Sequence, residues 1–158
     1  MLSIEIDTSK FLSAIDRFPN ELTTAIRQGL KDSAVMLIDG ARDEFNGHYN
    51  THTGEAARAI QIDDKKTTDT NVTVGLNVTE KMYPVYLHEG TKDHWVGPKD
   101  KKALHWVGGK QSFFSRGHMV SGIEKFQFIY IAAEKLKGKI IETVHKHIED
   151  AIQKARLK

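Results

Sequence analysis

The residues of this chain best placed for metal chemistry are His88, Glu89 and His94. Zinc metalloproteases place two histidines four apart on a helix, with a glutamate between them, so that both imidazoles face the metal. Here the two histidines are six apart, and Gly90 and Thr91 stand where that helix would have to run. The spacing therefore does not fit a metal site, and we expect these histidines to be exposed or to fill a place in the core.

Other catalytic patterns are missing from the sequence as well. No serine lies in a Gly-x-Ser-x-Gly turn. Gly108-Gly109-Lys110 lacks the four-residue spacer and the following Ser or Thr of a phosphate-binding loop. The chain has no cysteine, which excludes disulfides, Cys-ligated zinc, iron–sulfur clusters and a cysteine nucleophile. We therefore expect a protein that is not an enzyme and has no cofactor.

The most unusual segment runs from Tyr83 to Trp106. It contains both tryptophans, two of the four tyrosines, three histidines and two prolines. Loops normally carry small polar residues, so a loop with so many large side chains is expected to contact a partner. We predict a contact loop over about residues 79–122. Its expected interface residues are Tyr83, Tyr86, His88, Trp95, Lys99, Lys101, Lys102 and Trp106.

Nucleic acid is the alternative partner. Residues 90–117 contain five lysines and one arginine against two aspartates, with aromatic residues between them. This combination is typical of proteins that bind single strands. The formal net charge of the whole chain is only +2, so any argument for nucleic acid is local to this segment. We also expect at least one ring of Phe113 and Phe114 to lie in the core and Trp106 to mark the return of the loop to it.

A helical period dominates the N-terminal half. Apolar residues recur at steps of three or four at Leu22, Ile26, Leu30, Ala34, Leu37, Ala41 and Phe45. This pattern predicts a long helix that begins at Pro19 and ends at Asn46-Gly47. Gly29 and Gly40 weaken the helix, but a glycine on a packed helix also lets a neighbouring element approach closely.

Short strands are expected on either side of this helix. Residues 3–7 alternate between apolar and acidic side chains, and a first helical stretch then runs to Phe18. Residues 58–62 and 71–76 are the next strand candidates, joined by the polar loop 63–70. Such short links allow antiparallel pairing only.

The last third of the chain is predicted to be one helix over about residues 126–156. Its apolar positions are Ile129, Ala133, Leu136, Ile140, Val144, Ile148, Ala151 and Ala155. A helix of this length is longer than a small domain needs to cover its own sheet, so part of it is expected to pack on a neighbour. Together the elements predict a single α+β domain over residues 1–158, with a small, mainly antiparallel sheet packed against the two long helices. No secretory signal and no apolar run long enough to span a membrane occur, so a soluble protein is expected.

Several motifs occur together in an order that resembles a known family. Thr53-Gly54-Glu55-Ala56-Ala57-Arg58 precedes the Val-rich strand, and the run Tyr83-x-x-Tyr86-x-x-x-Gly90-Thr91 follows it. Pro98-Lys99 and Lys102-Ala103-Leu104-x-Trp106 come next, before the long C-terminal helix. In this order the chain resembles the head–tail connector or tail-completion (neck) proteins of tailed bacteriophages, the family named after gene product ten of a lambdoid siphophage. Residues 118–123 depart from the His-Pro-Gly turn of that family, because they lack the proline.

The resemblance, which covers most of the chain, implies a structural role. Proteins of this family are α+β subunits without a cofactor that assemble as a ring, here expected to be hexameric, at the head–tail junction of the virion. The implied partners are other copies of the chain, tail-tube or terminator proteins and connector proteins, with assembly in the host cytoplasm and no membrane contact. A subunit that is monomeric in solution and assembles only on its partner is compatible with this role. The lysines of the contact loop would then face DNA passing through the ring, in a non-specific contact.

Overall fold

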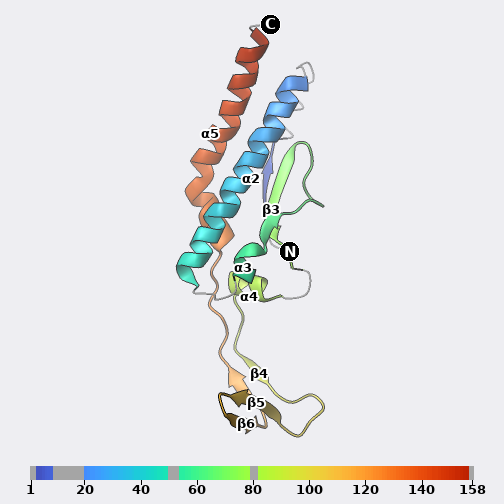
Figure 1. The fold of residues 1–158 in the computed structure, drawn as a ribbon, viewed down its shortest axis with the longest axis vertical. Helices are drawn as coiled ribbons and strands as arrows, with labels where there is room; N and C mark the ends of the chain where they lie inside the picture. The colour runs from blue at the N-terminus through green and yellow to red at the C-terminus, as the bar shows by residue number, and fades with distance from the viewer. Residues whose placement is uncertain (1–2, 9–19, 50–53, 79–81, 157–158) are drawn as a thin grey trace. The chain divides into compact units, whose positions relative to one another are not determined.

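The structure is a computed structural model that describes residues 3–8, 20–49, 54–78 and 82–156 (Figure 1). The helical stretch expected to run to Phe18 lies outside the described residues. Thr53, the first residue of the Thr53-Gly54 motif, lies outside them as well. The prediction of an α+β fold is confirmed. The chain divides into two compact units, residues 1–85 with 127–158, and residues 86–126. The prediction that residues 1–158 form one domain stays a prediction.

Two long helices form one layer of the first unit. Helix α2 spans Asn20–His48 and helix α5 spans Phe128–Arg156. All seven apolar positions predicted for α2 are buried, and Phe45 packs edge-on against Phe128 with ring centroids 5.2 Å apart. The predicted bounds hold to within two residues at each end, and α2 continues one residue past Asn46-Gly47, to His48.

The two helices pack antiparallel and closely, because glycines of α2 face α5. A Cβ at Gly29 would lie 3.1 Å from the Cα of Val144, and one at Gly40 would lie 2.5 Å from a methyl group of Leu136. The expected close approach at these glycines is therefore present. Two polar contacts flank the seam: Lys135 Nζ lies 2.6 Å from Glu44 Oε1, and His147 Nε2 lies 2.8 Å from Asp32 Oδ2.

A three-stranded antiparallel sheet forms the second layer. Its strands are β1 (Ser3–Asp7), β2 (Ile60–Ile62) and β3 (Asn71–Leu76), in the order β1-β3-β2. Ile4 and Ile62 both pair with Val74, which puts three apolar side chains on one face. Helix α2 covers β2 and β3 on that face, whereas α5 contacts β1. The apolar positions of the strands and of α2 thus share one core.

A short helix precedes β2. Helix α3 spans Glu55–Arg58 and follows Gly54, whose φ of 62° lies in the left-handed region that favours glycine. Arg58 was predicted to begin a strand, and that bound was wrong because the strand begins at Ile60. Arg42 of α2 fixes this corner: its Nε donates to the carbonyl of Ala57 at 3.2 Å and its Nη2 to that of Ile60 at 3.2 Å.

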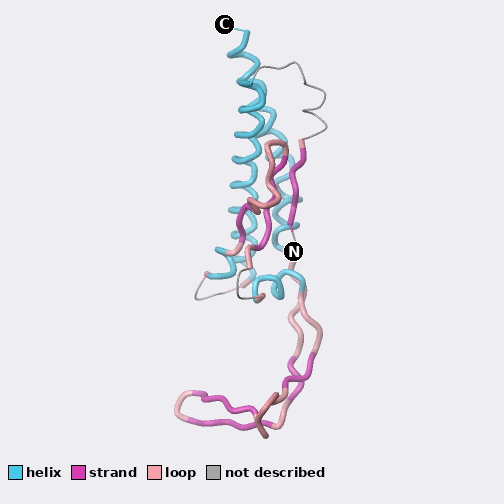
Figure 2. The backbone as a smooth tube through the Cα atoms, turned by 90° about the vertical axis from the view of Figure 1, so that its right-hand side faces the viewer, coloured by secondary structure: helices cyan, strands magenta, loops and turns pink. Residues whose placement is uncertain are grey.

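The segment expected to be a loop consists largely of secondary structure, so the assignment as a loop was wrong, whereas its role as a contact surface stays a prediction. It contains helix α4 (Tyr83–Glu89) and strands β4 (His94–Val96), β5 (Leu104–Gly108), β6 (Gln111–Ser115) and β7 (His118–Val120). Strand β4 pairs with β7 and β5 pairs with β6, both antiparallel. The smoothed backbone shows the two pairs in magenta as ribbons that follow one another, with a bend between them (Figure 2). None of the described helices is long and apolar enough to cross a membrane.

Candidate functional site

Residues 91–122, here called the β-arm, begin and end at a hydrogen-bonded root. Gly90 ends α4 with a φ of 74°, and its N–H donates to the carbonyl of Tyr86 at 2.9 Å. The N–H of Thr91 donates to the carbonyl of Ile123 at 2.9 Å, and the N–H of Ile123 donates to the Thr91 hydroxyl at 3.0 Å. A Cβ at Gly122 would overlap the Thr91 carbonyl oxygen. The two backbone segments that form the root therefore approach too closely for any residue other than glycine at position 122.

The first ribbon of the β-arm carries one tryptophan. Trp95 of β4 is directly opposite Met119 of β7. The indole of Trp95 lies over Gly117, whose φ is 135° and whose missing Cβ leaves room for the ring. Trp95 is nevertheless 62% exposed and Met119 60% exposed. The pair is therefore held in place on one side and open to solvent on the other.

The second ribbon carries aromatic rings on both faces. Trp106 pairs with Phe113, and the neighbouring pair is His105 with Phe114. Adjacent residues of a strand point to opposite faces, so these two pairs lie on opposite sides of the ribbon. The rings of each pair stack: the centroids are 5.8 Å apart for Trp106 and Phe113, and 4.7 Å apart for His105 and Phe114. Gly109, with a φ of 63°, starts the two-residue turn between the strands.

These rings do not reach a core. Trp106 is 45% exposed, Phe113 41% and Phe114 70%, so the expectations of a buried phenylalanine and of a return to the core at Trp106 were wrong. The physical reason is that a two-stranded ribbon has no second layer on which to bury either face. A high density of aromatic residues in a sequence indicates that their side chains will be buried. It does not show whether they are buried within the chain itself or against a partner.

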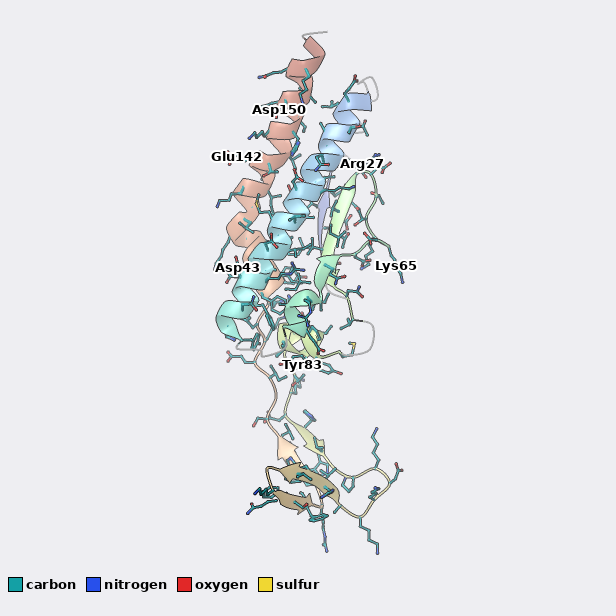
Figure 3. All side chains as sticks on the ribbon, in the orientation of Figure 1. Arg27, Asp43, Lys65, Tyr83, Glu142 and Asp150 are labelled. Atoms are coloured by element: carbon teal, nitrogen blue, oxygen red, sulfur yellow. The ribbon has the colours of Figure 1, made fainter. Side chains whose placement is uncertain are left out.

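The other predicted interface residues divide into exposed and buried ones. Tyr83 and Tyr86 are 48% and 46% exposed and lie three residues apart on α4, hence on one side of that helix (Tyr83 is labelled in Figure 3). Lys99, Lys101 and Lys102 are all exposed in the connection between β4 and β5. These lysines, the tyrosines, Trp95 and Trp106 are therefore free to contact a partner. That they do so stays a prediction.

His88 is the exception, because its side chain has no exposed surface and cannot serve as an open contact residue. Its Nδ1 lies 2.9 Å from Glu89 Oε1, and Lys125 Nζ lies 3.6 Å from the other oxygen of Glu89. Burial lowers the pKa of His88 below its usual 6.5, against the opposing effect of the hydrogen bond to Glu89. The placement of His88 at an interface is thereby corrected to a structural role.

Sequence reasoning missed two members of the exposed surface, Val107 and Met119, which are 63% and 60% exposed. Val107 follows Trp106, and Met119 stands between His118 and Val120. Val and aromatic residues are enriched in strands, and this composition was the one signal that could have revealed the ribbon.

The described residues contain no group of three or more histidine, aspartate or glutamate side chains that could hold a metal ion. His88 is buried, whereas His94 is exposed with its Nδ1 3.1 Å from the carbonyl of Lys92. No family model, curated protein or solved structure matches this chain. What the β-arm offers chemically is a broad aromatic and basic contact surface.

Proposed function

We propose that this protein is a non-enzymatic structural subunit that joins head and tail in a tailed bacteriophage, by assembling as a ring at the neck of the virion. The observation that carries the proposal is the exposure of aromatic side chains on both faces of the β-arm. The resemblance of the sequence motifs to neck proteins supports the biological setting, and the β-arm supports an assembly role.

Residues 86–126 present an exposed apolar surface, and exposed apolar patches mark interaction sites of proteins. Seven large side chains contribute to it, namely Tyr86, Trp95, Trp106, Val107, Phe113, Phe114 and Met119. Trp, Tyr, Phe and Met are the residues enriched at protein interfaces, and tryptophan and tyrosine dominate binding energies there. Because both faces are aromatic, a partner must cover both sides of the ribbon.

Helix α5 adds a second surface of the same kind. From Ala133 to Ala151, its predicted apolar positions, including Leu136, Ile140 and Val144, are only partly buried. Ile141 is 50% exposed and Tyr130 39%. This pattern supports the expectation that the helix is longer than its own fold needs and that part of it packs on a neighbouring subunit.

Deletion of the gene in its phage, followed by electron microscopy of the lysate, tests the proposal. We expect DNA-filled heads and separate tails, with joined particles restored when the wild-type protein is supplied from a plasmid. The double variant Trp95→Ser, Phe114→Ser should fail to restore joining, whereas Gln153→Ala, at an exposed position of α5, should succeed. Normal joined particles without the gene would refute the proposed function.

Nucleic-acid binding through residues 90–117 is the second candidate, and the exposure of lysines beside aromatic rings favours it. Fluorescence anisotropy with labelled single strands in a series of salt concentrations tests it. Binding that weakens steeply with salt, and that is lost in Lys99→Ala, Lys101→Ala, Lys102→Ala, would favour this function. If the β-arm acts on protein instead, the wild-type chain should show no such salt-sensitive binding to the labelled strands.

A further inference from the structure

Strand β2 ends the three-stranded sheet with an open edge. The N–H of Asn77 donates to the carbonyl of Ala59 at 2.7 Å, and the N–H of Asp63 donates to that of Thr73 at 2.8 Å. Backbone groups alternate along an antiparallel strand, so those of Ile60 and Ile62 point away from β3. The Ile60 carbonyl accepts from Arg42, which leaves the backbone groups of Ile62 facing the open edge.

Both sides of this edge are hollowed. On the side of α2 lies a shallow groove of about 340 Å³, lined by Val35, Ile38, Asp39, Arg42, Ile62 and Asp64. A second, smaller hollow of about 190 Å³ adjoins this groove and shares Gln61, Ile62 and Asp64 with it. It reaches the other face of the sheet at Asp63, Lys65, Gly75 and Asn77 (Lys65 is labelled in Figure 3). A strand added to β2 would direct alternate side chains into the two hollows.

The groove beside α2 is apolar at its centre and acidic at its rim. Val35 is 52% exposed there. Asp39 is 65% exposed and only 3.6 Å from Arg42, whose guanidinium is held by the carbonyls of the α3 corner. Asp64 is exposed and has no ion-pair partner among the residues that the structure describes. A basic, aromatic ligand fits such a groove.

The β-arm has that chemistry. Residues 91–122 carry six Lys and Arg against two Asp and no Glu, whereas the rest of the chain carries 17 Lys and Arg against 19 Asp and Glu. Phe113 and Phe114 follow each other on β6 and therefore point to opposite faces of their ribbon. Two adjoining hollows beside one sheet edge and two rings on opposite faces of one ribbon are complementary in number, and the positive charge of the β-arm complements Asp39 and Asp64.

We propose that the hairpin of β5 and β6 from one copy of this chain adds to the open edge of β2 in a second copy. Phe113 and Phe114 then enter the two hollows, and the lysines of the β-arm lie near Asp39 and Asp64. The contact joins two different patches of the same chain, so it propagates from copy to copy. This inference rests on the proposed function, because it names the surface through which the ring subunits would meet.

Engineered cysteines test the contact, since the chain has none of its own. The variant Gln61→Cys, Ser112→Cys places one thiol beside the open edge and one on β6, both at exposed positions. The matched control, Gln153→Cys, Ser112→Cys, moves the first thiol to exposed α5. Each variant is supplied to the deletion phage, and purified particles are treated with a short bis-maleimide cross-linker and run on a denaturing gel.

We expect the first variant to form a ladder of cross-linked subunits and the control to remain monomeric. The docking contact would be overturned if both variants cross-linked equally. It would also be overturned if the first variant were present in the particles but did not cross-link. Either result would leave the proposed function standing. Particles that lack the protein altogether would instead count against both. Asp39→Lys, Asp64→Lys provides a second measurement: its incorporation into particles should fall at least tenfold relative to wild type, and wild-type incorporation would contradict the contact.

Discussion

Replacement of Phe114 by serine separates the stability of the subunit from its assembly. Phe114 is 70% exposed, and its ring stacks on His105 with centroids 4.7 Å apart. Exposed side chains of this kind contribute little to folding, so the free energy of unfolding should change by less than about 0.5 kcal/mol. Phe45 is the matched control, because it has the same side chain with no exposed surface.

The expected loss in assembly follows from the exposed area. A phenylalanine buries roughly 200 Å² when fully enclosed, so a ring that is 70% exposed has about 140 Å² left to bury in a contact. At about 25 cal/mol per Å², this area contributes about 3.5 kcal/mol to association. Since about 1.4 kcal/mol corresponds to a tenfold change, Phe114→Ser should weaken each contact by up to about 300-fold.

Two assays measure the two effects. Sedimentation velocity over a concentration series reports assembly. If the wild-type protein alone is monomeric, the tail-tube or terminator protein of the same phage is added. Urea unfolding followed by circular dichroism reports stability. Phe45→Ala should lose about 3–5 kcal/mol of stability, because it opens a cavity beside Phe128. The reasoning fails if Phe114→Ser unfolds as easily as Phe45→Ala, or if it assembles with wild-type affinity.

Four further predictions concern the fold. Gly138→Ala should raise the free energy of unfolding in urea by about 1 kcal/mol, because this exposed helical position has open space around it. Gly29→Ala should lower it despite the same gain in helix propensity, since its Cβ would press on the backbone of α5; equal effects would contradict the packing. Gly122→Ala should speed amide hydrogen exchange at Thr91, because the root of the β-arm must open, and unchanged protection there would argue against that root. Burial lowers the pKa of His88, so the unfolded chain takes up its proton first as the pH falls below about 6.5. Stability should then decrease from about pH 7.5 to about pH 5.5 and decrease less in His88→Gln, as urea unfolding at the two pH values would show.

Most of the first unit could be predicted from the sequence. The seven apolar positions of α2 repeat at a helical period, and all are buried. Alternation of Val72, Val74 and Leu76 predicts β3, and the short connection from residue 63 to residue 70 predicts its antiparallel pairing with β2. Local pattern suffices here because each element buries one face in the shared core, and burial of one face is what periodicity records.

The β-arm could not be predicted in the same way. Its strands are three to five residues long, and aromatic residues occupy both faces, so no alternation of apolar and polar side chains marks them. The sequence indicated only that large side chains gather in residues 83–106. Whether these side chains are buried depends on whether another protein surface packs on the ribbon. The sequence of the segment itself does not show this. For His88 the sequence left both an exposed and a core position open, and the structure buries its side chain.

The β-arm and the open edge of β2 are both liabilities in an isolated subunit. Unpaired strand edges and exposed rings favour association with other chains, and proteins usually protect such edges. The docking contact proposed above covers both features at once, with one β-arm and one β2 edge used at each contact. An open chain of subunits leaves one β-arm and one edge uncovered at its ends, whereas a closed ring leaves none. Because closure gains one further contact without adding a subunit, the ring should be more stable per subunit than any open chain of the same length. Incomplete rings should therefore be rare at equilibrium, and electron microscopy of assembled Phe114→Ser, in which each contact is weaker, should show more of them.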